Sequence, residues 1–549
     1  MGLLNPIPPP YDALEWNEKP FPEKSRMVCE AWAAQGYGTP LPVYLVYALK
    51  VALYVSAWVF FCGFTPGLGA LHDIARWWLH PTAFQKAILW SMLFEAIGLG
   101  CGSGPLTGRY FPPVGGLLYF VRPGTTRLPL FPELPLFRGV RRSVFDVALY
   151  LAYVAVVVRA LVSPAVTPAL IVPFMALVPL LTLRDKTIFL ASRGEHYFTT
   201  LVCFVLASDW IPGAKAVQLA LWFWAGFSKL NHHFPAVVCV MTSNSPVLRL
   251  PWLRRRMYRD FPRDLRPSRL AEVMAHAGTA LEFSVPIVLG LSHGGAGTTV
   301  GLVLMLMLHG YITSNVPMGV PIEWNVMVVY GGFFLFGAHA SSEVLSVSPW
   351  YLALYLALVL IALPLAGNLW PRGVSFLVSM RYYAGNWAFS QWIFKGESYR
   401  KLDRGLVKSA PWVYDQLDRF YDRATSVGLV GKVLGFRAMH LHGRTLRTLL
   451  PQAVASLEGY TLVDGEIVAG LVLGWNFGDG HLHDEQLLAA VQAQCGFEDG
   501  ELRCVFVESQ PFLGDTMAWR IHDARAGLVA QGEAKVADLR AVQPWDPAA

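Results

Sequence analysis

Charged residues are scarce in this chain. Of its 549 residues 15% are charged and 54% are hydrophobic, and the mean hydropathy is +0.41. Soluble globular domains carry about 25% charged residues. The composition therefore excludes an ordinary soluble domain and predicts a polytopic membrane protein. The net charge of +6 is less informative than its distribution, because the positive residues gather in particular loops.

Several sequence signals of other protein classes are absent. The seven cysteines are odd in number and show no CxxC spacing, so neither a disulfide framework nor a zinc site is predicted. There is no P-loop, no dinucleotide glycine fingerprint after a strand, no GxSxG and no HExxH. The first forty residues lack the apolar segment of a cleavable signal peptide, so the first membrane helix is expected to act as the targeting signal.

Apolar runs predict about ten membrane-spanning helices, most of them within the roughly 17 to 25 residues that a bilayer requires. The runs are 43–64, 83–101, 144–162, 166–183, 197–211, 214–230, 270–291, 298–316, 324–338 and 350–367. Lys and Arg concentrate in the connections on one side, whereas the other side holds only Arg76, Arg159 and Lys215. This asymmetry predicts that both termini are cytoplasmic.

The predicted fold is an all-α polytopic membrane bundle with a small C-terminal α+β soluble domain. Its parts are an N-terminal cytoplasmic arm (1–42), a transmembrane domain (43–370), interfacial or amphipathic helices (371–455) and the α+β domain (456–549).

Local patterns within the last two parts predict individual elements. Residues 431–454 form a basic amphipathic helix pattern that suits a membrane surface. Asp464-Gly465 inside the alternating stretch 460–475 predicts a hairpin. Asp484 is expected to cap a helix over 485–494, and strands are expected at 502–508, 517–522 and 528–536.

The candidate site centres on Lys229, at the end of an apolar aromatic run. On a helix, Ala225 and Gly226 lie one turn before Lys229, and His232 and His233 lie three and four residues after it, so all five share one face. An ionisable group in a membrane segment usually faces a bundle interior and marks a functional site. The alternative is that the span ends near residue 230 and Lys229 reaches the interface as a topological charge.

Glu282 and His309 lie inside consecutive predicted spans and are expected to partner the lysine region. Alternatively, these residues form ion pairs or hydrogen bonds that only stabilise the bundle and have no functional role. A lysine desolvated among aromatic residues becomes a usable base, whereas a neighbouring carboxylate keeps it charged. The pattern does not distinguish these two environments.

The run Trp-Ala-Gly-Phe-Ser-Lys-Leu (224–230), followed by helices with Glu282 and His309, resembles the HTTM superfamily, the membrane fold of vitamin K-dependent gamma-carboxylases. The likeness covers about residues 140–370. It implies that Lys229 is a base toward a quinone, with Glu282 and His309 at positions that are polar in the superfamily. The overall layout also resembles the bacterial transmembrane family DUF3556, which implies an inner-membrane location. The small soluble part departs from the carboxylases, so protein carboxylation is not expected.

Three classes of function follow. The first is an enzyme acting on a quinone, isoprenoid or acyl lipid, with Lys229 as base and His232, His233, Glu282 and His309 tuning it. The second is lipid binding or transport, and the third is a membrane anchor for a cytoplasmic interaction domain. The basic run Arg254, Arg255 and Arg256 suits anionic head groups, and nothing indicates nucleic acid.

Histidine pairs in the C-terminal part have strand-like spacing. They are His440 with His442 and His481 with His483. A metal site needs three or four ligands, and no such set is visible in the sequence, so none is predicted.

Overall fold

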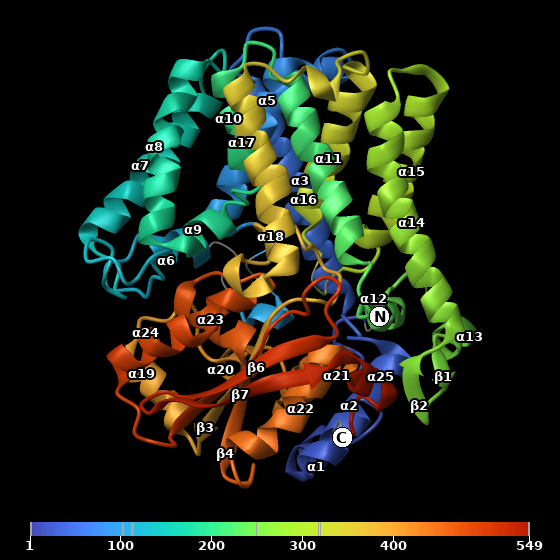
Figure 1. Cartoon of the computed structure of the whole chain (residues 1–549), viewed down its shortest axis with the longest axis vertical. Helices are drawn as coiled ribbons and strands as arrows, with labels where there is room; N and C mark the ends of the chain where they lie inside the picture. Colours follow the sequence, from blue (N-terminus) through green and yellow to red (C-terminus); the bar gives the residue numbers. More distant parts are fainter. Residues whose placement is uncertain are drawn as a thin grey trace.

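The helical part of the protein forms one layer, and the C-terminal sheet with its helices forms a second layer beneath it (Figure 1). The computed structural model describes residues 3–101, 104–110, 115–248, 250–316, 318 and 320–546. Both ends of the described chain lie on the side of the C-terminal layer (Figure 1).

Within the part of the chain that the structure describes, five helices are long and apolar enough to cross a membrane. They are α3 (Leu41–Cys62), α7 (Val144–Leu161), α14 (Arg269–Leu291), α15 (Gly295–Thr313) and the segment Trp350–Leu369, which comprises α17 (Trp350–Ala357), a π-helical stretch (Leu358–Ala362) and α18 (Leu363–Leu369). At most 39% of each apolar window is buried inside the protein. The remaining apolar surface suits contact with lipid.

The other apolar runs form shorter or less apolar helices. These are α5 (Pro81–Ala96), α8 (Pro168–Arg184), α10 (Tyr197–Leu206), α11 (Ile211–Ser228), α12 (Phe234–Asn244) and α16 (Ile322–Gly332), which continues as a π-helical stretch to Ala338. Thirteen of the sixteen residues of α5 are buried, so this helix packs in the interior of the layer. The expectation of about ten spans is thus confirmed only for the five long helices.

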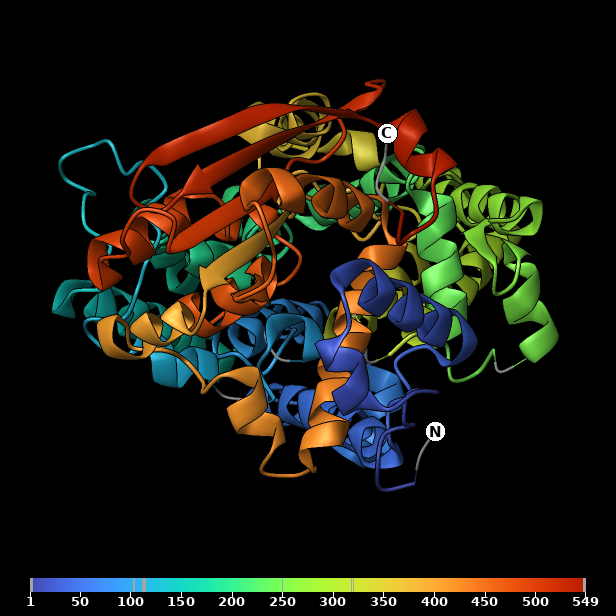
Figure 2. The same cartoon turned by 90° about the horizontal axis from the view of Figure 1, so that it is seen from below.

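The N-terminal arm folds against the rest of the protein. It contains α1 (Ala13–Glu18) and α2 (Phe21–Gln35), which lie beside α21 (Arg423–Met439), an orange helix of the C-terminal layer (Figure 2). Trp32 is fully buried, and its indole N–H donates to the carbonyl of Val240 at 3.2 Å. The arm therefore joins the C-terminal layer to α12 of the membrane layer.

The C-terminal sheet has five antiparallel strands in the order β4-β3-β5-β6-β7. They are β3 (Phe389–Lys395), β4 (Tyr460–Asp464), β5 (Leu502–Val507), β6 (Thr516–Asp523) and β7 (Gly527–Lys535). The last three confirm the predicted strands. Strand β3 comes from the segment predicted as interfacial helices, so the sheet uses residues that precede position 456.

The predicted hairpin at Asp464-Gly465 is wrong. Asp464 ends β4, and its side chain accepts the backbone N–H of Glu466, which makes it the N-cap of α23 (Gly465–Leu473). Aspartate followed by glycine suits a turn and a helix start alike, because its carboxylate satisfies free N–H groups in both. The predicted cap at Asp484 is confirmed, since it accepts from the N–H of Gln486 at the start of α24 (Glu485–Cys495).

The predicted surface helix 431–454 is also wrong in its placement. It forms parts of two helices, α21 (Arg423–Met439) and α22 (Leu441–Ala453). The basic side chains that defined the predicted helix are buried in protein, namely Lys432, Arg437, Arg444 and Arg447. Lys432 donates to the carbonyls of Ile7 and Tyr37, and Arg437 pairs with two carboxylates. Protein acceptors therefore replace the head groups that the amphipathic pattern suggested.

The remaining elements are short. They are α4 (Ile74–Trp77), α6 (Gly115–Phe120), α9 (Lys186–Ala191), α13 (Pro251–Arg256), the antiparallel pair β1 (Tyr258–Asp260) and β2 (Asp264–Pro267), α19 (Lys401–Gly405), α20 (Val413–Leu417) and α25 (Val536–Ala541).

Candidate functional site

Lys229 and Glu282 form a buried ion pair between α11 and α14. The Nζ atom of Lys229 lies 2.5 Å from Oε2 of Glu282 and donates to the carbonyl of Ala225 at 3.0 Å. The two side chains are 11% and 5% exposed. The ring of Phe283 on α14 packs over Gly226, at 3.4 Å from the position that a Cβ would take. Lys229 is therefore a sheltered, paired cation rather than an open interfacial charge.

His309 on α15 is held by two hydrogen bonds. The indole N–H of Trp222 donates to its Nε2 at 2.9 Å, and its Nδ1 lies 2.7 Å from Oδ1 of Asn325. An indole nitrogen can only donate, so Nε2 carries no proton and Nδ1–H donates to the amide oxygen. His309 is thus a neutral imidazole whose two nitrogens are both occupied by protein.

His232 and His233 face the C-terminal layer. Nδ1 of His232 lies 3.3 Å from a guanidinium nitrogen of Arg540. The ring of His233 stacks on that of His442 with centroids 4.9 Å apart, and its Nε2 lies 3.3 Å from the sulfur of Met517. Burial, and then the nearby His442 ring, lowers the pKa of His233 well below its ordinary value. A neutral stacked ring suits docking of the two layers.

The predicted site residues thus fall into three separate environments. The structure brings Lys229 and Glu282 together, places His309 with Trp222 and Asn325, and turns the two histidines toward the C-terminal domain. The sequence pattern placed Lys229, His232 and His233 on one face of a continuous helix. This prediction is wrong, because α11 ends at Ser228, before these three residues.

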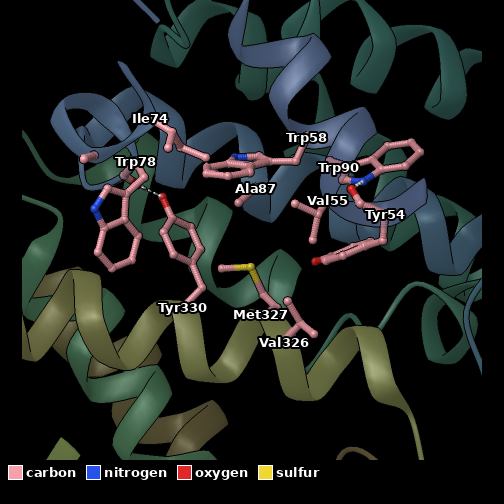
Figure 3. Close-up of a pocket in the computed structure, with 11 residues that line it drawn as sticks. Tyr54, Val55, Trp58, Ile74, Trp78, Ala87, Trp90, Val326, Met327 and Tyr330 are labelled. Atoms are coloured by element: carbon pink, nitrogen blue, oxygen red, sulfur yellow. Dashed lines mark hydrogen bonds between the residues drawn. The ribbon is translucent and has the colours of Figure 1, made fainter. Parts of the chain in front are cut away.

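An apolar pocket that sequence reasoning missed lies between α3, α4, α5 and α16 (Figure 3). Its volume is about 340 Å³. Aromatic rings from several elements form most of its wall. The lining residues are Tyr54, Val55, Trp58, Ile74, Ala75, Trp78, Ala87, Trp90, Val326, Met327 and Tyr330. The Tyr330 hydroxyl is satisfied by the carbonyl of Trp78 at 2.6 Å, so the wall presents rings and aliphatic groups.

Buried charges lie one helical turn from this pocket. Lys50 precedes Tyr54 by four residues on α3, and Glu323 precedes Met327 by four residues on α16. Residues four apart lie on the same helix face. On α5, Glu95 follows Ser91 by four residues, and the Ser91 hydroxyl bonds to that of Tyr54. The three helices therefore bring three charges to the same end of the pocket.

These charges belong to a buried network. Lys50 Nζ lies 2.9 Å from Glu323 Oε2. Arg193 lies 3.9 Å from Glu95 and 3.6 Å from Glu195, and one of its nitrogens lies 3.6 Å from the Cys101 sulfur. The backbone N–H of Cys101 donates to Glu95 at 3.1 Å. We call Lys50, Glu95, Cys101, Arg193, Glu195 and Glu323 the acid–thiol cluster.

None of the cluster's residues belongs to the site predicted around Lys229, although its carboxylates Glu95, Glu195 and Glu323 border apolar runs in the sequence. A lysine within the first apolar run was a usable signal, because an ionisable residue there requires a partner in the bundle.

Fold and site together define a class: a polytopic membrane protein in which a helical layer with an apolar pocket and buried ion pairs rests on an α+β domain. The chain belongs to a family of transmembrane proteins of unknown function, DUF3556, whose match extends over residues 1–549. No curated protein and no solved structure is significantly similar to it.

Proposed function

We propose that the protein binds a membrane-soluble amphiphile, a quinone, isoprenoid or acyl lipid, with the apolar part in the pocket and the polar end toward the acid–thiol cluster. The observation that carries this proposal is the position of an apolar aromatic pocket one helical turn from buried charges. The pocket volume of about 340 Å³ is within the range of small-molecule sites.

The physical setting explains why both parts are needed. A lipid chain in the bilayer is already in apolar surroundings, so moving it into the pocket gains little from the hydrophobic effect. Shape and ring contacts then select the chain, and the polar end supplies most of the binding energy through charge-assisted hydrogen bonds. The buried charges of the acid–thiol cluster supply such partners.

Filling the pocket is expected to remove the ligand. Ala87 lines the pocket and is 4% exposed. The variant Ala87→Phe places a ring in this space, and overpacking against a bound chain costs about 1 to 3 kcal/mol, which corresponds to binding weaker by roughly 5- to 150-fold. We expect photolabelling by a diazirine fatty acid or diazirine isoprenoid, mapped to peptides of α3, α5 and α16, to fall by about that factor.

The matched control is Val300→Phe on α15, which adds a similar ring at an exposed position outside the pocket. It is expected to label like the wild type. Equal labelling of Ala87→Phe and wild type would show that the pocket does not hold the chain.

A second candidate function is enzymatic, with Lys229 as the base. The observation that favours it is a sheltered lysine in contact with one carboxylate; an ionised Glu282 keeps Lys229 charged, so Lys229 acts as a base only after its proton has moved across this contact to Glu282. The amine then accepts a proton from a hydroxyl of a lipid-soluble substrate such as a quinol. Glu282 and His309 lie at positions that are polar in the HTTM superfamily, as the resemblance implies, whereas His232 and His233 face the C-terminal layer.

This candidate predicts a difference between two Lys229 variants. Lys229→Arg keeps a cation beside Glu282 but cannot act as a base near neutral pH, whereas Lys229→Ala loses the cation as well. If Lys229 is a base, mass spectrometry of co-purified lipids is expected to show the same unprocessed compound with both variants. A wild-type lipid profile for Lys229→Arg, with a changed profile for Lys229→Ala alone, would assign Lys229 a charge-pairing role instead.

The proposed location is the bacterial inner membrane with both termini in the cytoplasm. The placement of both ends on the side of the C-terminal layer supports it (Figure 1). On the same side, Arg255 and Arg256 of α13 are exposed and Arg254 is half-buried. The two exposed side chains suit contact with anionic head groups.

A further inference from the structure

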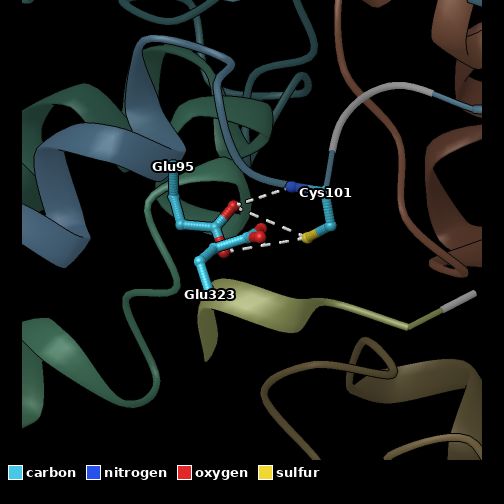
Figure 4. A group of neighbouring side chains, drawn as sticks. All are labelled: Glu95, Cys101 and Glu323. Carbon is cyan, nitrogen blue, oxygen red and sulfur yellow. Dashed lines mark hydrogen bonds between the residues drawn. The ribbon is translucent and has the colours of Figure 1, made fainter. Parts of the chain in front are cut away.

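The side chains of Glu95, Cys101 and Glu323 point toward one another from three parts of the membrane layer (Figure 4). Glu95 ends α5, Cys101 lies in the loop after it, and Glu323 lies in the first turn of α16. One ligand atom from each residue lies within 4.8 Å of the others. We infer that these three residues form a binding site for one divalent metal ion of the zinc class.

The distances suit such an ion. Zinc lies about 2.3 Å from a cysteine sulfur and about 2.0 Å from a carboxylate oxygen, which places the two ligand atoms about 3.5 Å apart in a tetrahedral site. Oε2 of Glu95 lies 3.5 Å from the sulfur of Cys101. A carboxylate oxygen of Glu323 lies within 4.8 Å of a ligand atom from each of these two residues.

Glu323 provides an independent indication of a ligand. It is 2% exposed, and its Oε1 has no hydrogen-bond partner among the residues that the structure describes. Its contact with Lys50 is an ion pair at Oε2, which leaves Oε1 without a polar partner among those residues. Burying an unsatisfied carboxylate oxygen is costly. A cation at the centre of the cluster would satisfy it.

The charges of the acid–thiol cluster also favour a cation. Counted as ionised, the three carboxylates Glu95, Glu195 and Glu323 exceed the two cations Lys50 and Arg193 by one negative charge in a buried place. Metal binding to cysteine releases the thiol proton. A divalent ion together with a Cys101 thiolate would make the cluster electrically neutral.

The donor set limits the type of metal. A thiolate favours zinc and other thiophilic metals, whereas carboxylates alone suit magnesium, calcium or manganese. Three protein ligands leave a fourth position for water or a substrate atom, as in catalytic rather than structural zinc sites. The inference goes beyond the proposed function, because metal binding at these three residues does not depend on which ligand, if any, occupies the pocket.

The test is a titration of the full-length protein with Co²⁺ alone, in lipid nanodiscs and after treatment with a chelator. We expect about one equivalent of Co²⁺ to bind, with the near-ultraviolet charge-transfer absorption of a thiolate–cobalt bond, and excess Zn²⁺ to displace it. Cys101→Ser is expected to abolish this absorption, and Glu323→Gln to weaken binding by about tenfold or more. Cys203→Ser, which removes a buried thiol in α10, is the matched control and is expected to match wild type.

Two results would overturn the inference: no charge-transfer absorption in wild type, or the same absorption in Cys101→Ser. Thermal unfolding of the metal-free variants establishes that they are folded. If Cys101→Ser does not fold, the test uses Glu323→Gln and Glu95→Gln instead. The inference would then be overturned if both variants bound Co²⁺ as tightly as the wild type. The pocket variant Ala87→Phe is expected to bind Co²⁺ normally, so failure of the pocket proposal is distinguishable from failure of this one.

Discussion

The variant Glu282→Gln is expected to lower the free energy of unfolding of the membrane layer by about 3 to 5 kcal/mol. It leaves the ammonium of Lys229 buried without its carboxylate, and breaking a buried ion pair by removing one partner carries a cost of that size. The measurement is unfolding of the purified protein in mixed micelles by denaturant titration, compared with wild type. A loss below about 1 kcal/mol would show that water reaches Lys229.

Two further variants complete this test. The double variant Lys229→Met and Glu282→Leu removes both charges, and is expected to be more stable than Glu282→Gln alone because no unpaired charge remains. The exposed pair Lys19–Glu23 joins the same residue types at 2.8 Å. Its variant Lys19→Met is expected to leave the stability close to that of the wild type.

The second large effect is expected from Arg437→Met in the C-terminal layer. Arg437 is 2.7 Å from Asp464 and also pairs with Glu466, and all three side chains are nearly inaccessible. Burial lowers the pKa of Arg437, but the two carboxylates outweigh it and the net pKa is raised. Removing the guanidinium leaves two buried carboxylates unpaired. The expected loss is about 3 to 5 kcal/mol near neutral pH.

The loss is expected to shrink as the pH falls. Burial raises the pKa of Asp464 above its ordinary value even though Arg437 lowers it, and the variant removes that opposing cation. A carboxyl with a raised pKa in the folded state is most favourable to folding at low pH, and its contribution is lost as the pH rises through the folded pKa. The measurement is the stability difference between variant and wild type at several pH values.

Arg423→Met is the matched control for this prediction. Arg423 pairs with Asp418 at 2.8 Å, but the two side chains are 54% and 39% exposed. The control is expected to cost about 1 kcal/mol or less at every pH. A difference for Arg437→Met that grows on acidification would contradict the assigned charge states.

Much of the fold follows from local sequence patterns. The long apolar runs predicted the five helices that can cross a membrane, and alternation predicted β5, β6 and β7. Asp484 marked the start of α24 because an aspartate cap acts within one turn. Local patterns failed where two structures share one signal, as at Asp464, which caps a helix instead of turning a hairpin.

The candidate site was predicted only in part, for the same reason. Lys229 and Glu282 stood out because each is an ionisable residue in an apolar run, and the structure pairs them. The pocket and the acid–thiol cluster draw on helices that are far apart in the sequence, such as α3 and α16. A single sequence gives no information on which helices become neighbours.

The sequence by itself determined that this is a membrane protein with a C-terminal α+β domain, because hydropathy and periodicity are local properties of the chain. Tertiary structure alone decided that Arg437 is buried with carboxylates and that Lys50, Glu95, Cys101 and Glu323 meet beside an apolar pocket. The physical reason is that a buried charge must find its counter-charge in space, and helix packing, not distance along the chain, determines which one it meets.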